Sequence, residues 1–143
     1  MPIPERFRFA ENQILRVKSD LGRISRIRLI AYREGRAEDA AQAQVRLLET
    51  ELKNVAALAS YVRTISPAAA QELVGRHSVA AERFERLKAA GDAAALQGWL
   101  REELAPLVNK SEQAAHLVAT SIRLEKGKKP EPFGWRMRKE KQF

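Results

Sequence analysis

The sequence predicts an all-α protein, a bundle of four to five helices, and three observations support this. Glycine and proline are sparse, with 7 and 6 residues among 143, whereas Ala, Leu, Glu, Arg and Gln are plentiful. Aliphatic residues recur at steps of three and four, as on one face of a helix. The breaks between these segments carry helix-stop and helix-start residues. We therefore expect one domain with one core.

The first helix is expected to follow an irregular N-terminal arm. Residues 1–8 form this arm because they contain two prolines, and the helical bundle domain covers 9–125. The helix runs from about residue 9 to 34 and stops at Gly35. Residues 26–32 also alternate like a strand, but the helical pattern upstream favours helix. The expected buried positions are Ile14, Val17, Leu21, Ile24, Ile27 and Ala31.

The second helix covers about 37–65 and carries the most regular heptad pattern of the chain. The short link around Gly35 implies a long antiparallel hairpin, with each helix about 40 Å long. The expected heptad positions are Val45, Leu48, Leu52, Val55, Ala59 and Val62.

The third helix is predicted over 67–90. Ser66 is a natural N-cap, and Pro67 suits the first helical position because its missing N–H is not needed there. Gly75 lies off the apolar face, so a continuous helix is expected, with a break near 76–78 as the alternative. The apolar face consists of Ala70, Leu73, His77, Ala80, Phe84 and Leu87.

The last helices follow Gly91 and Asp92, which form a stop and an N-cap. A fourth helix covers about 93–104, and Pro106 either kinks it or begins a fifth helix that ends near 124. Residues 126–143 form a basic and aromatic tail, expected to be extended unless a partner orders it. The apolar positions are Leu96, Trp99, Leu100 and Leu104, then Val108, Ala115, Val118 and Ile122.

The positive charge is concentrated at the two ends of the chain. The net charge is +8, yet residues 37–125 hold ten basic and twelve acidic side chains. Residues 1–36 hold nine basic and four acidic side chains, and 126–143 hold seven and two. Such a distribution indicates acidic partners rather than a general device for solubility.

Arginines form one face of the first helix, within an arc of about 100° on a helical wheel. They are either a solvated face paired with acids of the middle helices or a surface for an anionic ligand. Arginine presents a planar fork that suits phosphate, and nearby acids are too few to pair with all of them. Arg28 falls on the apolar side, where its stem can lie along the core. The candidate phosphate-binding residues are Arg16, Arg23, Arg26 and Arg33 of this face, together with Arg36 beyond its end.

The tail interleaves basic and aromatic side chains. Such segments attract phosphate and stack on unpaired bases, and they also bind acidic protein grooves or anionic membranes. A purely solubilising tail is the alternative. The candidate binding residues are Lys126, Lys128, Lys129, Phe133, Trp135, Arg136, Arg138 and Lys139.

The sequence favours no enzyme, metal or cofactor. It lacks cysteine, the phosphate-cradling glycine loops and the zincin pattern, and we expect no catalytic residue. His77 is expected to be a core or interface histidine, and the pair Glu112–His116 has no second such pair to complete a metal site. Glu49 and Glu51 are expected on the helix surface, as are Glu102 and Glu103. The composition indicates a soluble, cytoplasmic protein, because no apolar run reaches the roughly 20 residues that span a bilayer.

The function expected from these features is that of a non-enzymatic nucleic-acid-binding subunit of a larger complex, with RNA favoured over DNA. Small subunits of CRISPR effector complexes and accessory proteins of reverse transcriptases share this size and charge. Ile27, Leu29 and Ile30 add apolar surface that predicts an oligomer or other protein subunits as partners. The alternative is a protein–protein adaptor or assembly chaperone, and membrane-surface binding through the tail is a third, weaker possibility.

Overall fold

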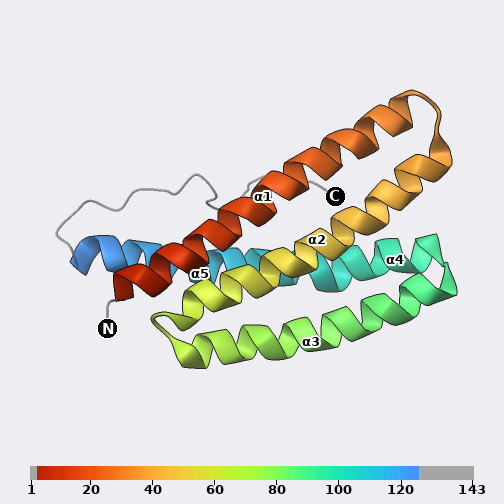
Figure 1. The fold of residues 1–143 in the computed structure, drawn as a ribbon. Helices are drawn as coiled ribbons and strands as arrows, with labels where there is room; N and C mark the ends of the chain where they lie inside the picture. Colours follow the sequence, from red (N-terminus) through yellow and green to blue (C-terminus); the bar gives the residue numbers. More distant parts are fainter. Residues whose placement is uncertain (1–2, 126–143) are drawn as a thin grey trace.

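A computed structural model describes residues 3–125 and consists of α-helices, with no strand in that range (Figure 1). The all-α bundle is therefore confirmed. A link at 34–36 joins the first two helices, which lie side by side and antiparallel. The helices are α1 (Ile3–Arg33), α2 (Ala37–Arg63), α3 (Pro67–Ala90), α4 (Ala93–Trp99), the π-helical turn η1 (Leu100–Leu104) and α5 (Ala105–Glu125).

Helix α1 begins at Ile3, so the prediction of an irregular arm is wrong for residues 3–8. The prediction assumed that Pro4 would prevent a helix. In the first turn a proline costs little, because the N–H that it lacks has no acceptor within the helix. Glu5, also in the first turn, places negative charge near the positive end of the helix dipole.

The helix ends follow their local signals. Gly35 and Gly91 adopt the left-handed conformation, with φ of 75° and 67°, which stops α1 and α3. The Ser66 hydroxyl accepts a hydrogen bond from the backbone N–H of Ala69 at 3.4 Å, and Asp92 Oδ1 accepts one from Ala95 at 3.0 Å. These side chains cap α3 and α4 as predicted.

Helix α3 runs through Gly75 without a break, and a fifth helix does begin beside Pro106. The transition passes through a wider turn, in which the Ala105 N–H donates to the carbonyl oxygen of Leu100, five residues earlier. Pro106 has no N–H to donate, so a local departure from the α-helical pattern costs little at this point.

Helix α2 is the centre of the bundle, since α1, α3 and α5 all contact it. Its buried side chains lie on more than the single face that the heptad predicts. They include Tyr61, whose ring lies 4.8 Å from that of Phe7, whereas Phe84 of α3 lies 5.2 Å from Trp99. The heptad residues Leu48, Leu52, Val55, Ala59 and Val62 are all buried, and Val45 is half-buried.

The prediction that Ile27 is buried is wrong, because 40% of the residue is exposed. The inward-facing steps of α1 pass from Ile24 to Arg28 and then to Ala31. Arg28 is half-buried and donates a hydrogen bond to the side-chain oxygen of Gln44 on α2. Its aliphatic stem thus replaces the expected isoleucine at the interface.

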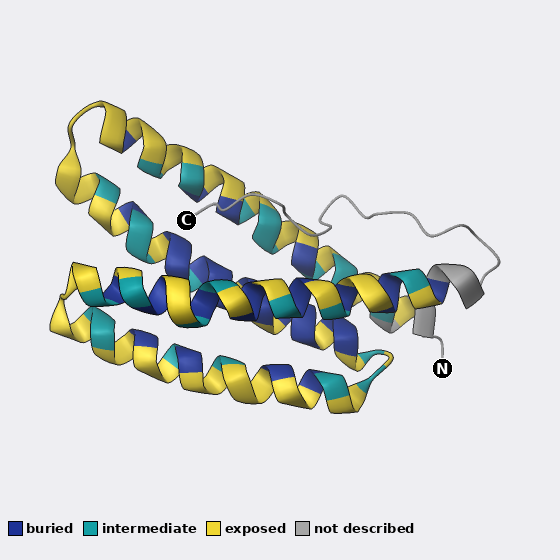
Figure 2. Cartoon of the chain, turned by 180° about the vertical axis from the view of Figure 1, so that it is seen from behind, coloured by how far each residue is buried: buried dark blue, intermediate teal, exposed yellow. Residues whose placement is uncertain are grey.

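The α1–α2 pair diverges from the other helices toward the 34–36 link, where exposed residues prevail (Figure 2). A small separate cluster of Leu21, Ile24 and Leu47 holds this end together. The larger cluster joins all the helices at the other end. Arg23, Arg26 and Arg33 of α1 therefore lie on the projecting part of the α1–α2 pair, whereas Arg16 lies where α1 packs on the bundle.

Polar side chains are buried where α2 and α5 contribute to the core. Glu51 was expected on the surface but is only 1% exposed, and it accepts a hydrogen bond from Asn54 at 3.2 Å. On α5, buried Glu112 pairs with Lys18 of α1. Within residues 3–125, no helix has both the length and the apolar character required to cross a membrane.

Candidate nucleic-acid interface

The outer face of α1 carries an exposed arginine stripe, which we define as Arg16, Arg23, Arg26 and Arg33. All four side chains are exposed, so none of them is used to build the core. The stripe covers 17 helical steps, or about 25 Å along the helix axis. Ile30 lies within its arc and is 43% exposed, so the surface is not purely charged.

Most of this stripe has no acidic neighbour. Arg23 pairs with Asp20 at 3.3 Å, an exposed contact that contributes little. Arg16, Arg26 and Arg33 form no ion pair with any residue that the structure describes. Their guanidinium groups are therefore available to an external anion.

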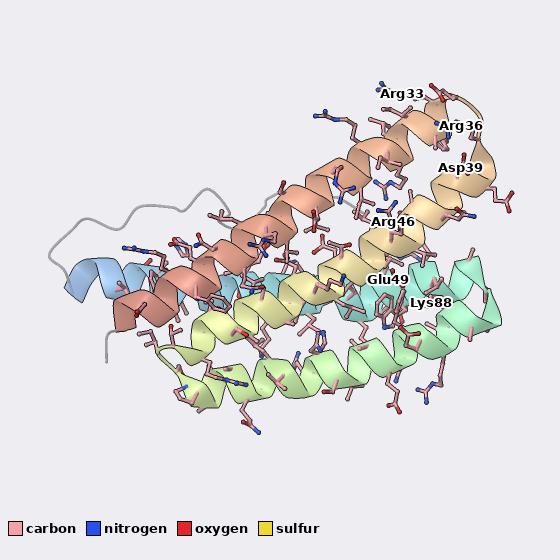
Figure 3. All side chains as sticks on the ribbon, viewed as in Figure 1. Arg33, Arg36, Asp39, Arg46, Glu49 and Lys88 are labelled. Carbon is pink, nitrogen blue, oxygen red and sulfur yellow. The ribbon has the colours of Figure 1, made fainter. Side chains whose placement is uncertain are left out.

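Acids of the middle helices pair with other partners. Glu49 of α2 binds Lys88 of α3 at 2.9 Å, as Figure 3 shows, and this contact chiefly accounts for the raised pKa of Lys88. Glu103 lies 3.2 Å from Arg83. These pairs connect helices within the bundle, so Glu49 and Glu103 do not serve as counter-charges for the α1 stripe.

Arg36 differs from the stripe. It lies at the link between α1 and α2, close to Asp39 (Figure 3). Its guanidinium contacts Asp39 at 2.7 Å and Glu34 at 2.8 Å. Hydrogen bonds to Asp39 and then Glu34 raise the pKa of Arg36 above its ordinary value. Two local carboxylates thus compete with any external phosphate, so Arg36 is a weaker candidate than Arg33.

Helix α2 adds basic residues that sequence reasoning missed. Lys53 lies as far after Gly35 as Val17 lies before it, so the antiparallel register brings the two residues together. Arg46 is likewise opposite Ile24, and Figure 3 shows it on α2 next to α1. Counting outward from the link would have found both residues, because two helices of equal pitch keep their register.

A shallow groove of about 390 Å³ lies between α1 and α2 on this side of the molecule. We call it the α1–α2 groove. Exposed Phe9 lies on one side and exposed Lys53 on the other. Its lining consists of Phe9, Ala10, Gln13 and Val17 from α1, and Lys53, Ala56, Ala57 and Ser60 from α2.

A second groove of about 520 Å³ lies between α3 and the η1–α5 junction. Its rim includes Glu72, Glu102 and Glu103, so it does not favour phosphate. Lys110 lies 3.0 Å from Glu72, and its hydrogen bond keeps the pKa of that carboxyl below the ordinary value. Arg76 also lines this groove, 3.7 Å from Glu72.

Possible metal ligands are not clustered in the described residues. No group of three or more histidine or carboxylate side chains is positioned to hold a metal ion there. Glu112 and His116 do not face the same space. Glu112 points into the core toward Lys18, whereas His116 is exposed. His77 is half-buried on the inner side of α3.

The predicted binding residues of the tail, from Lys126 to Lys139, lie outside the described residues. The structure thus places the arginine stripe on one exposed face of α1, and Lys53 of α2 lines a groove with Phe9 and Val17 of α1. Comparison of the chain with protein-family models, with curated proteins and with solved structures finds no match. The candidate interface therefore depends on the chain's own residues.

Proposed function

We propose that this protein is a non-enzymatic, nucleic-acid-binding subunit of a larger ribonucleoprotein or nucleoprotein complex. The observation that carries the proposal is the arginine stripe: exposed guanidinium groups on a projecting helix, three of them without an ion pair among the described residues. A phosphate backbone is a repeating anion that matches such a linear array. RNA is the preferred ligand and DNA the second.

Binding is expected to be led by phosphate contacts. Each arginine that engages a phosphate releases condensed counterions, which makes the affinity fall as salt rises. The long α1–α2 hairpin presents the arginines on a rigid support, and the basic tail of residues 126–143 adds further contacts. Recognition is then largely independent of sequence, because phosphates carry no base information.

Partner subunits are expected at the projecting end of the hairpin. Leu29 and Tyr32 are 46% and 76% exposed there, on a side of α1 that differs from the arginine stripe. Apolar side chains grouped in this way are typical of a surface that another protein covers. This supports assembly into a multi-subunit complex or oligomer.

The same apolar residues favour a second candidate function, that of a protein–protein adaptor or assembly chaperone. In that case the projecting end binds a partner helix, and the tail docks in an acidic groove. The two candidates differ in their response to salt. Phosphate binding weakens steeply with ionic strength, whereas apolar docking persists.

The experiment is a titration of nuclease-treated protein into labelled single-stranded RNA, single-stranded DNA and duplex DNA at about 50 and 200 mM salt. Four phosphate contacts on a single strand predict a loss of about 50-fold in affinity over that range. Micromolar or tighter binding with this salt dependence supports the proposal. Absence of binding at low salt contradicts it and favours the adaptor.

A further inference from the structure

We infer that the α1–α2 groove binds an unpaired base of a single-stranded nucleic acid, with the base stacked on Phe9 and a phosphate further along the strand on Arg16 and Lys53. This inference rests on the proposed function and goes beyond it. It names the form of nucleic acid that the interface prefers and a residue that determines the preference.

The groove is a consequence of small side chains on facing helices. Ala10 and Ala57 are buried and form its floor, whereas Ala56 and Ser60 are exposed along the α2 side. Where larger aliphatics would fill the space between two helices, these residues leave a hollow. Its volume of about 390 Å³ falls within the range of pockets that hold small planar ligands.

Phe9 lies at the edge of the α1–α2 groove, and 67% of the residue is exposed. Its neighbour Phe7 has a structural role, with its ring 4.8 Å from that of buried Tyr61. Phe9 instead lines the open groove, where its ring is accessible to a ligand. Proteins that bind single strands use exposed aromatic rings in this way, because every base offers a face on which to stack.

Two cations lie together at the end of the groove away from the aromatic ring, because Lys53 is level with Val17 and Arg16 precedes Val17. Arg16 lies two helical turns after Phe9 on the same face of α1, and Lys53 lines the opposite side of the groove. Neither side chain forms an ion pair among residues 3–125. Two acids one turn from these cations are engaged elsewhere, Asp20 by Arg23 and Glu49 by Lys88, whereas exposed Glu5 lies one turn before Phe9 on α1. A ligand with a planar apolar part and an anionic group about 10 Å further along is complementary to this arrangement.

A single strand fits this description and a duplex does not. In a duplex the faces of the bases are covered by their neighbours, so only phosphate and sugar can reach Phe9 and the groove. In a single strand one base can leave the stack and lie on the ring while a phosphate further along the strand contacts Arg16 and Lys53. The stripe arginines beyond Arg16 then bind the phosphates of a single strand or of a duplex, whereas the groove binds single strands.

The test compares Phe9→Leu, which keeps the apolar bulk and removes the aromatic face, with Phe9→Trp, which keeps it. Leu117→Ala is the control, because Leu117 is another highly exposed apolar residue, on α5, and does not line the groove. Each variant is titrated into a fluorescent single-stranded RNA and a duplex of the same length, after circular dichroism has shown native helix content.

We expect Phe9→Leu to lower the affinity for the single strand by about 5- to 150-fold, the range for losing one stacked base, and to leave duplex affinity within about twofold. Phe9→Trp and Leu117→Ala are expected to keep wild-type affinity for both ligands. Wild-type single-strand affinity in Phe9→Leu, or equal losses for both ligands, overturns the inference while leaving the proposed function in place.

Two further outcomes contradict the inference in other ways. A fall in oligomer mass of Phe9→Leu by light scattering, at unchanged single-strand affinity, assigns the groove to a second copy of the chain. Absence of nucleic-acid binding by the wild-type protein removes the proposed function and the inference together.

Discussion

Lys18 of α1 donates a hydrogen bond to Glu112 of α5, and both side chains are largely removed from solvent. The pair joins the first helix of the bundle to the last. Each charge has lost hydration on folding, so each depends on the other for compensation. The contact therefore fixes how the projecting α1 is anchored to the bundle.

Replacing Lys18 with Met is expected to destabilise the protein by about 3–5 kcal/mol, because it leaves the Glu112 carboxylate buried without this partner. Urea denaturation followed by circular dichroism measures the change. Replacement of exposed Lys53 with Met is the control, with an expected change within about 0.5 kcal/mol. A Lys18→Met protein as stable as the control shows that the pair contributes nothing.

Two glycines are expected to respond in opposite directions to substitution by alanine. Gly75 lies inside α3, where a Cβ added to it would meet nothing within 4 Å, so Gly75→Ala should stabilise by about 0.5–1 kcal/mol. Gly91 has φ of 67°, where a side chain is strained, so Gly91→Ala should destabilise by about 1 kcal/mol.

Thermal unfolding of the two glycine variants beside the wild type measures both signs in one experiment. Raised melting temperature for Gly75→Ala and lowered melting temperature for Gly91→Ala is the expected result. A Gly75→Ala variant that melts below the wild type contradicts the continuous, unstrained path of α3 at this position.

The Glu72–Lys110 contact predicts a pH dependence of stability. Lys110 lowers the pKa of Glu72 relative to the unfolded chain, so the contact stabilises the fold above the ordinary pKa of a glutamate. That contribution is lost as pH falls through the lower, folded pKa. The difference in melting temperature between wild type and Glu72→Gln should thus be present at about pH 7 and shrink below about pH 4.

The matched variant for this contact is Lys110→Gln. In that background Glu72→Gln should no longer change the melting temperature in a pH-dependent manner, because the main cause of the shift is gone. The effect is expected to be small, as both side chains are well exposed. A difference that grows toward acid pH has the wrong sign and contradicts the assignment.

The helices and their ends were predictable because their signals are local. Ser66 and Asp92 cap the helices that they precede, and Gly35 and Gly91 end the helices that they follow. The start of α1 was missed because Pro4 in a first turn and Pro4 in a loop look alike in sequence. The four stripe arginines were predicted as one exposed face, and the structure places them so.

Other features depend on which helix covers which face, and a periodic pattern does not contain that information. Glu51 is buried because α2 is covered on several sides. The place of Arg28 at the α1–α2 interface was, by contrast, predictable from its position on the apolar side of the helix. Phe9 and Lys53 are brought together only by the pairing of α1 with α2. Their common groove becomes visible once the register of the two helices is known.

The most direct test of the central claim compares two quadruple Arg→Gln variants with the same change in net charge, each titrated into single-stranded RNA at low salt. The first changes the stripe residues Arg16, Arg23, Arg26 and Arg33. The second changes exposed arginines elsewhere, namely Arg63, Arg76, Arg86 and Arg101. We predict an affinity loss of at least about tenfold for the first and less than about threefold for the second, with native helix content in both. Equal losses would show that only total charge matters, and unchanged affinity of the stripe variant would remove α1 from the interface.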